Sequence, residues 1–165
     1  MNTERAALIG SLGASVQAAL ATTRALTDAQ ARLPSGDEGW PLVIVAYHIG
    51  LGLRRQAGWI ARALTAEAPF AFDWEGTHEL NAVIAREHGA LPPDEAVREI
   101  EEAWARLRTV IDRMEDGDWD RDVFAFNGRL RSADVVLSRI MLRHVTDHLE
   151  SMRRTLAATA GAPWG

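Results

Sequence analysis

Residues 91–114, LPPDEAVREIEEAWARLRTVIDRM, form the clearest helical pattern in the sequence. Their apolar side chains recur at alternating steps of three and four residues, which is the spacing of one face of an α-helix. The apolar positions are Val97, Ile100, Trp104, Leu107, Ile111 and Met114. Most of the other side chains are charged, so the stretch predicts an amphipathic helix that buries one side against its neighbours.

The rest of the chain predicts three more long helices and one short helix. We expect the long helices at residues 3–26, 41–66 and 133–158 and the short one at residues 77–88, where Thr77 would cap it. An Asn-Gly turn within residues 122–131 predicts a small hairpin, whereas residues 68–76 are expected to be a loop and no strand pattern is able to build a sheet. Four amphipathic helices of this length predict an all-α four-helix bundle.

Composition limits the class of protein. A chain of 165 residues predicts one domain, residues 1–165. The net charge of −5 and the lack of a basic tract argue against a nucleic-acid partner. No uninterrupted apolar run approaches the ~18 residues of a membrane span, and Glu4 and Arg5 open a polar-interrupted N-terminal helix. We therefore expect no membrane partner and a cytoplasmic protein.

Two residue types are missing from the sequence. There is no cysteine, and all 18 basic residues are arginine, so there is no lysine. These absences exclude thiol nucleophiles of the chain, thiolate metal ligands and lysine Schiff bases. Any transition metal must therefore be held by His, Asp or Glu side chains.

Three histidines fall on apolar helix faces. His144 and His148 stand one helical turn apart, so their Cβ atoms lie about 5–6 Å from each other and their rings can share one metal. His48 lies on the apolar face of the helix at 41–66, and Gly52, one turn further on, leaves space beside it. We predict His48, His144 and His148 as metal ligands with one coordination position open. Two alternatives remain at this point: a core His48 bonded to a backbone carbonyl, and an idle His pair on a surface.

Three further residues are candidates for substrate binding. Arg55 lies two turns beyond His48 on nearly the same face and could clamp an anionic group. Asn81 of the short helix could point inward, and Trp59 could form a wall of the site. The alternatives are a solvated arginine at the bundle end, a capping or surface asparagine, and a core tryptophan.

Three stretches together resemble one family. These are GWPLVIVAYHIGL at 39–51, HELNAVIAREHGALPPDEAVREIEEAW at 78–104 and LRSADVVLSRIMLRHVTDHLESM at 130–152. The first is similar to the signature that opens the second helix of the DinB/YfiT-like superfamily of metal-dependent four-helix bundles, and the third to its last helix. The order and separation of the three stretches carry the resemblance, which covers most of the chain.

The resemblance implies an up-down-down-up bundle that binds zinc or nickel through three histidines, which match His48, His144 and His148 here. It also implies a homodimer. Some members, including mycothiol-dependent maleylpyruvate isomerase, use the metal to activate a low-molecular-weight thiol. That isomerase has Glu-x3-His on its last helix where this chain has His144 and His148.

The sequence therefore favours a metal-dependent enzyme that acts on a small molecule, either a thiol S-transferase or a hydrolase. The metal would activate a thiol or a water molecule. Two alternatives use the same residues: a binding or stress-response module without turnover, and a structural bundle with core histidines.

Overall fold

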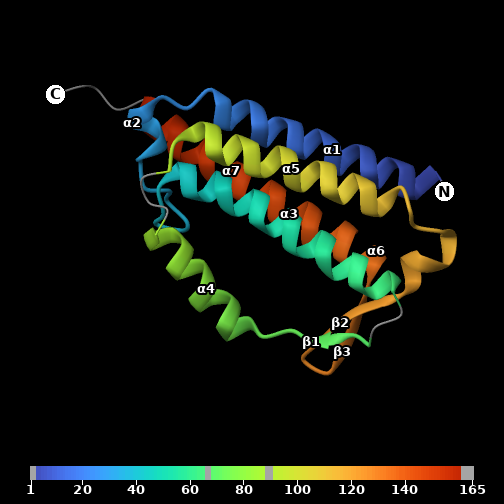
Figure 1. Ribbon diagram of the computed structural model, residues 1–165. Coiled ribbons are helices and arrows are strands. Elements are labelled where there is room, and N and C mark those ends of the chain that lie inside the picture. Colours follow the sequence, from blue (N-terminus) through green and yellow to red (C-terminus); the bar gives the residue numbers. More distant parts are fainter. Residues whose placement is uncertain (1–2, 66–67, 88–90, 161–165) are drawn as a thin grey trace.

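The computed structural model describes residues 3–65, 68–87 and 91–160, and long helices make up most of it (Figure 1). The long helices are α1 (Thr3–Arg24), α3 (Leu42–Leu64), α5 (Pro93–Ile111) and α7 (Leu142–Ala160). The shorter helices are α2 (Asp28–Ala31), α4 (Trp74–Glu87), α6 (Ala133–Val135) and a 3-10 helix at Asp116–Asp120. The strands are β1 (Phe70–Ala71), β2 (Asp122–Phe126) and β3 (Arg129–Ser132).

The four long helices form the predicted bundle. α1 lies beside α5 and α7, and α3 lies beside the same two helices, so the four close into a ring. α1 and α7 run in one direction while α3 and α5 run in the other, which is the up-down-down-up order (Figure 1). In the sequence, α4 follows α3 and precedes α5, and it carries the chain back to the end of the bundle where α3 begins (Figure 1). Because of this return, α3 and α5 can run in the same direction.

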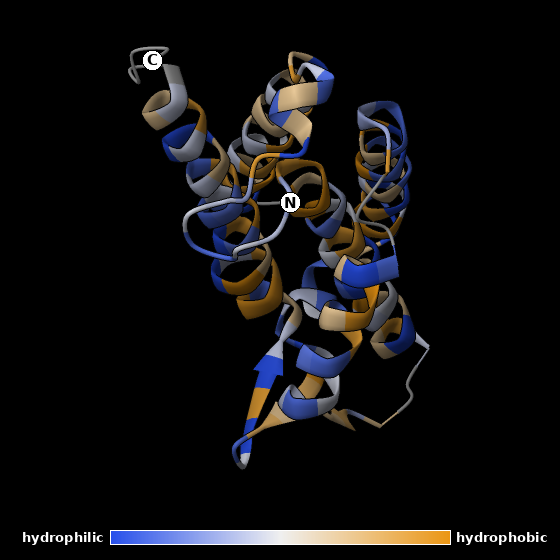
Figure 2. Cartoon of the chain, turned by 90° about the vertical axis from the view of Figure 1, so that its left-hand side faces the viewer, coloured by the Kyte–Doolittle hydropathy of each residue, from blue (hydrophilic) through white to orange (hydrophobic). Residues whose placement is uncertain are grey.

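The bundle core follows the helical periodicity of the sequence. On α5, Ile100 and Leu107 are fully buried, as the opening pattern predicts. Each long helix carries both hydrophobic and hydrophilic stretches along its length (Figure 2). At Gly50 of α3, an added Cβ would come within 2.9 Å of the backbone nitrogen of Ile100, so the absence of a side chain lets α3 and α5 approach closely.

α1 is the one described helix that is long and apolar enough to cross a membrane. Core helices of soluble proteins meet the same criteria of length and composition. Here Leu12, Val16 and Leu20 of α1 are buried in the bundle core. The helix therefore uses its apolar residues for packing against α5 and α7.

The hairpin prediction is confirmed, but the expectation that no sheet would form is wrong. β2 and β3 pair antiparallel across Asn127 and Gly128, whose φ angles of 50° and 70° suit a tight Asn-Gly turn. β1 then pairs parallel with β2 to make a three-stranded sheet. A two-residue strand is too short to show an alternating pattern, so the sequence of residues 68–76 predicts only a loop.

The start of α4 and the continuity of the last helix also differ from the predictions. α4 begins at Trp74, not at a Thr77 cap, because Asp73 supplies the contacts at its start: its Oδ1 accepts from the backbone N–H of Gly76 at 3.1 Å and its carbonyl from the Thr77 hydroxyl at 2.6 Å. The predicted end at His88 lies outside the described residues. The continuous helix predicted at 133–158 is instead interrupted by a π-helical segment at Val136–Met141.

Candidate metal centre

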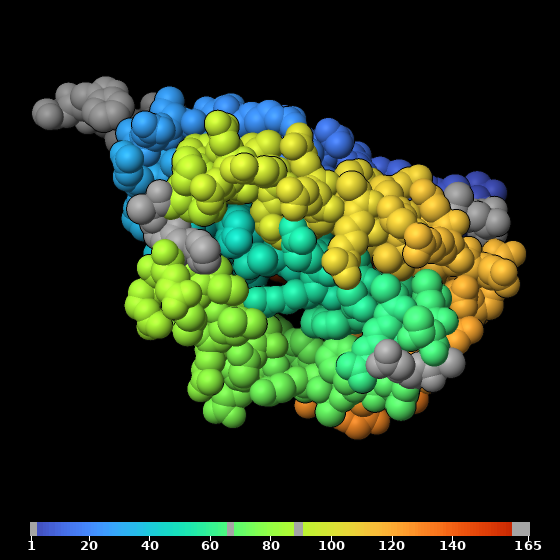
Figure 3. Space-filling view, in the orientation of Figure 1, coloured from blue at the N-terminus to red at the C-terminus, as the bar shows by residue number. Residues whose placement is uncertain are grey.

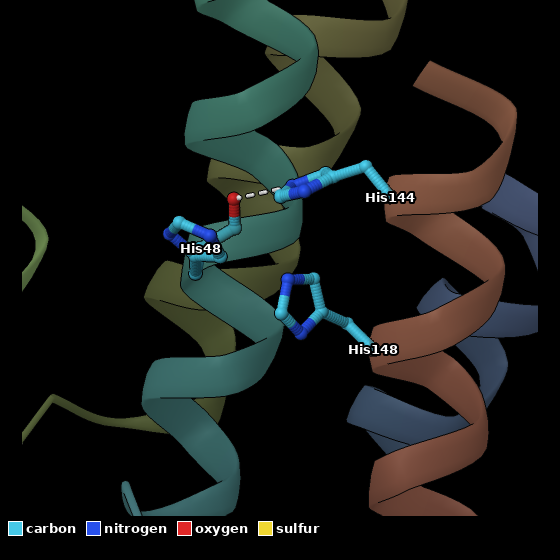
Figure 4. A group of neighbouring side chains, drawn as sticks. All are labelled: His48, His144 and His148. Atoms are coloured by element: carbon cyan, nitrogen blue, oxygen red, sulfur yellow. Dashed lines mark hydrogen bonds between the residues drawn. The ribbon is translucent and has the colours of Figure 1, made fainter. Parts of the chain in front are cut away.

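The three predicted ligands converge on one point between α3 and α7. His48 projects from α3, while His144 and His148 project from consecutive turns of α7 (Figure 4). One ring nitrogen of each histidine lies within 4.8 Å of those of the other two. The ring centroids of His144 and His148 are 4.6 Å apart, and each lies 4.9 Å from that of His48. Residues separated by 96 positions in the chain thus form a compact triad.

His48 is buried, and its ring has no hydrogen bond within the described part of the chain. Its exposed fraction is 8%, and neither ring nitrogen has a hydrogen-bond partner among the described residues. Its pKa is lowered to about 2, first by burial and then by His144, His148 and Arg55. A buried imidazole normally finds a partner for its polar atoms. The alternative of a core histidine bonded to a backbone carbonyl therefore does not apply to His48.

Space for the His144 ring comes from Gly52 of α3. A Cβ at Gly52 would lie 2.1 Å from Nε2 of His144, so only glycine admits the ring in its present position. Nε2 also lies 3.3 Å from the backbone carbonyl oxygen of His48. If Nε2 donates its proton to that oxygen, Nδ1 keeps its lone pair for a ligand. The pKa of His144 is lowered to about 4, chiefly by burial and then by His148, so the ring is neutral at pH 7.

A carboxylate orients the third histidine. Nδ1 of His148 lies 2.7 Å from Oε1 of Glu38, and the other carboxylate oxygen accepts a 2.6 Å hydrogen bond from the Ser151 hydroxyl. A proton on Nδ1 that points at a carboxylate leaves Nε2 as the free lone pair, which is the usual arrangement of a metal-binding histidine. Burial raises the pKa of Glu38, but hydrogen bonds from Ser151, Ser35 and His148 outweigh it and the pKa is lowered overall.

The sequence reasoning missed Glu38 and Ser151. Glu38 belongs to the loop before α3, where a carboxylate gives no sign of its role. Ser151 follows His148 by three residues on α7 and is buried. A serine on the apolar face of the helix, one turn after a predicted ligand, is the sequence feature that could have identified it. Asp147, the acid next to the pair in sequence, is exposed and forms an ion pair with Arg143 at 3.0 Å.

A pocket of about 910 Å³ opens beside the triad. The three histidines line its wall together with residues of α3, α4, the sheet and the π-helical segment. Figure 3 shows a hollow between α4 and the bundle. α4 has no fully buried residue, and its Thr77, Leu80 and Asn81 line the pocket.

The three predicted substrate-binding residues all line this pocket. Arg55 donates a 2.9 Å hydrogen bond from Nη1 to Oδ1 of Asn81, which links α3 to α4. Trp59 packs against Phe70, Phe72 and Phe124 with ring centroids 5.4–5.5 Å apart. Trp59 is therefore both part of an aromatic cluster that joins the sheet to α3 and part of the pocket wall.

Gln56 is a pocket residue that the sequence reasoning missed. It is 5% exposed, and its Oε1 has no hydrogen-bond partner among the described residues. An unpaired buried amide oxygen costs free energy. Gln56 also belongs to the pocket wall, so this unpaired oxygen lies in the layer of residues that surrounds the pocket.

The chemistry of the triad fits a divalent transition metal. Zinc binds imidazole nitrogen at about 2.0–2.1 Å, and modest rotation of rings whose nitrogens are within 4.8 Å of one another reaches that geometry. Because His48 and His144 keep depressed pKa values, no proton competes for their lone pairs at neutral pH. Three ligands would leave a further coordination position, and the pocket lies beside the triad.

A protein-family model matches most of the chain. The model of the DinB superfamily matches residues 12–152, a range that contains all three histidines. The chain belongs to the DinB superfamily. The family resemblance predicted from the three sequence stretches is thereby confirmed. A search of curated proteins found no match.

Solved structures show the same fold. YfiT from Bacillus subtilis, described as "a probable metal-dependent hydrolase with an unusual four-helix bundle topology", is 16% identical with a TM-score of 0.78, covering 98% of this chain and 91% of that chain. Mycothiol-dependent maleylpyruvate isomerase is 19% identical with a TM-score of 0.66, and a mutant of it gives 0.73. Both of these alignments cover 99% of this chain and 71% of that chain. This DinB member thus has the predicted bundle fold.

Proposed function

We propose that this DinB protein is a divalent-metal-dependent enzyme that acts on a small molecule, as a thiol S-transferase or a hydrolase. The observation that carries the proposal is the convergence of His48, His144 and His148 on the wall of a large pocket. Three imidazoles suit zinc and nickel. The two solved relatives described above, a probable metal-dependent hydrolase and a thiol-dependent isomerase, support both reaction types.

Each residue of the site has a separate role in this proposal. The three histidines hold the metal and do not act as acids or bases, because their lone pairs are engaged. Glu38 fixes the tautomer and orientation of His148 through the 2.7 Å contact. A bound metal would lower the pKa of a water molecule, or hold a thiol as its thiolate, and so supply the nucleophile. The pocket beside the triad would position the second reactant.

The pocket beside the triad supports an enzyme rather than a closed structural site. Structural zinc sites are fully ligated by protein, whereas sites with three protein ligands usually keep the fourth position for water or substrate. Here the triad adjoins a pocket of about 910 Å³, within the range of small-molecule sites. A purely structural metal would need no such space.

The metal is tested first, on protein purified without an affinity tag. After incubation with zinc or nickel and removal of free metal, we expect about one equivalent per chain by elemental analysis, and a loss of that metal in His144→Ala. His78→Ala is the matched control, since His78 lines the pocket but is exposed and outside the triad. Less than ~0.2 equivalents in the unmodified protein would refute metal dependence.

Turnover is tested next with the metal-loaded protein. Mycothiol, bacillithiol and glutathione are each offered with an electrophile such as 1-chloro-2,4-dinitrobenzene, and ester and amide substrates are offered without thiol. We expect metal-dependent turnover in one of the two groups that is lost in His144→Ala. Stoichiometric metal binding without turnover in either group would instead support a binding module.

A further inference from the structure

The pocket beside the triad carries an excess of positive charge. Arg55, Arg131 and Arg139 line it, and Glu38 supplies the only carboxylate that the described residues contribute to its wall. Glu38 is already engaged by His148 and Ser151. The chain as a whole has a net charge of −5, so this local excess runs against its composition.

None of the three arginines has an ionic partner among the described residues. Arg131 and Arg139 form no ion pair or side-chain hydrogen bond there, and Arg55 bonds only to the neutral amide of Asn81. Neighbouring Arg54 shows the contrast, because it binds the Glu99 carboxylate through two hydrogen bonds of 2.6 and 2.7 Å. Several exposed arginines of the chain also lack an ion pair, and Arg139 is itself exposed, but Arg55 and Arg131 are partly buried in the pocket wall.

Burial makes the missing partner of Arg55 more costly. Arg55 is partly buried, and burial lowers the pKa of its guanidinium. The pKa of Arg54 is instead raised, mainly by its hydrogen bonds to Glu99. A desolvated cation is stabilised when an anion approaches it within hydrogen-bond distance. An anionic ligand in the pocket would therefore stabilise the charged form of Arg55.

The rest of the wall is aromatic. Six aromatic side chains line the pocket: Trp40, Trp59, Phe72, Trp74, Phe124 and Phe126. Arg55 lines the same pocket as the triad, two helical turns after His48 on α3. An anion at Arg55 would therefore share the pocket with the metal position, with the aromatic surface available to its apolar part.

We propose that the substrate of this pocket is an organic carboxylate with an aromatic or extended apolar body, bound through its carboxylate by Arg55, Arg131 and Arg139. The placement of the carboxylate beside a metal rests on the proposed function; the recognition by arginine does not. Arg55 would exchange its bond to Asn81 for the bidentate contact that guanidinium groups make with carboxylates. The aromatic wall would bury the body of the molecule.

The test uses a pair of probes of nearly the same shape, of which one is an anion and the other is neutral. 2-Naphthoate and 2-naphthamide are titrated into the chelator-treated, metal-free protein by isothermal titration calorimetry. We expect the carboxylate to bind at least about tenfold more tightly than the amide, and added salt to weaken the carboxylate alone. Arg55→Gln and Arg131→Gln should each remove most of this preference. Arg98→Gln is the matched control, because Arg98 is exposed on α5 and lies outside the pocket.

The outcomes separate this inference from the metal proposal. Equal affinity for the two probes in the metal-free protein would overturn it, as would a preference that Arg55→Gln and Arg131→Gln leave unchanged. A preference that arises only after metal is added would also overturn it, because the metal itself would then hold the carboxylate. A preference in protein that takes up no metal would support arginine recognition and refute only the metal dependence. Circular dichroism of each variant checks that the helices remain folded.

Discussion

Gly52→Ala is the substitution whose effect follows most directly from the geometry of the site. The new methyl carbon would lie 2.1 Å from Nε2 of His144. An ordinary van der Waals contact needs about 3.5 Å, so the ring must retreat by more than about 1 Å. Metal sites tolerate errors of only about 0.2 Å in ligand distance. The substitution should therefore remove His144 as a ligand without changing its chemistry.

The expected magnitude is large for so small a change. Loss of a residue that merely orients a ligand costs about 10–100-fold in metal affinity, so displacing the ligand itself should cost at least about 100-fold. Alanine ordinarily stabilises a helix interior relative to glycine by about 0.4–1 kcal/mol. At Gly52 the clash should outweigh this gain, since overpacking costs about 1–3 kcal/mol. The metal-free variant should thus melt at the same or a lower temperature than the unmodified protein.

Gly58→Ala on the same helix is the matched control. A Cβ at Gly58 meets no other atom within 4 Å. It should leave zinc affinity unchanged and raise the melting temperature by about 1–4 °C. Zinc affinity is measured by competition with a chromogenic chelator, and melting is followed by circular dichroism with and without zinc. Zinc should raise the melting temperature of Gly58→Ala but not that of Gly52→Ala.

One result would refute this reasoning. If Gly52→Ala binds zinc as tightly as the unmodified protein, the His144 ring does not need the space above Gly52 in its ligating position. The triad geometry would then differ from the one described, and the metal would have to be held in another way. A loss of affinity in both glycine variants would also count against the local clash, because Gly58 has no contact with the site.

Three further predictions follow from the same contacts. Glu38→Ala should lower zinc affinity about 10–100-fold, because the His148 ring would no longer be held by a carboxylate. Asp37→Ala is the control and should leave zinc affinity unchanged. If chelator competition gives Glu38→Ala the affinity of the unmodified protein, Glu38 does not orient His148. The pKa values of His48 and His144 are depressed in the folded protein, so the unfolded chain binds more protons below about pH 6.5. The free energy of unfolding of the metal-free protein should therefore fall by up to about 2 kcal/mol per histidine between pH 7 and pH 5. A free energy from urea unfolding that does not change with pH would disprove this. Phe124→Ala should destabilise the fold by about 3–5 kcal/mol by opening the aromatic cluster, and a change below about 1 kcal/mol would show that the sheet is not packed on α3.

The local elements were largely predictable because their causes lie within a few residues of one another. The steps of three and four residues between Val97, Ile100, Trp104 and Leu107 define a helix face without reference to the rest of the chain. The Asn-Gly turn at residues 127–128 favours positive φ angles in the same local way. β1 was missed because Phe70 and Ala71 become a strand only by pairing with β2, which lies more than 50 positions away.

The site likewise has one part that local sequence predicts and another that it does not. The spacing of His144 and His148 fixes their shared helix face, so this half of the triad is a property of the sequence alone. The π-helical segment before them was not predictable from the sequence. On a regular α-helix, a step of five residues would turn Arg139 about 140° away from His144, so the sequence did not predict that the two share a pocket. Arg139 of the π-helical segment nevertheless lines the same pocket as His144.

The sequence by itself determined the helices, the tight turn, the ligand chemistry left by the absence of Cys and Lys, and the candidate histidines. Only the tertiary structure brought His48 to the pair on α7, placed Glu38 on His148, and left the pocket arginines without carboxylates. The physical reason is the separation, along the sequence, of the residues that interact. Helix periodicity and turn geometry depend on near neighbours, whereas metal-ligand convergence, hydrogen-bond partners and uncompensated charge depend on how distant segments pack in the bundle.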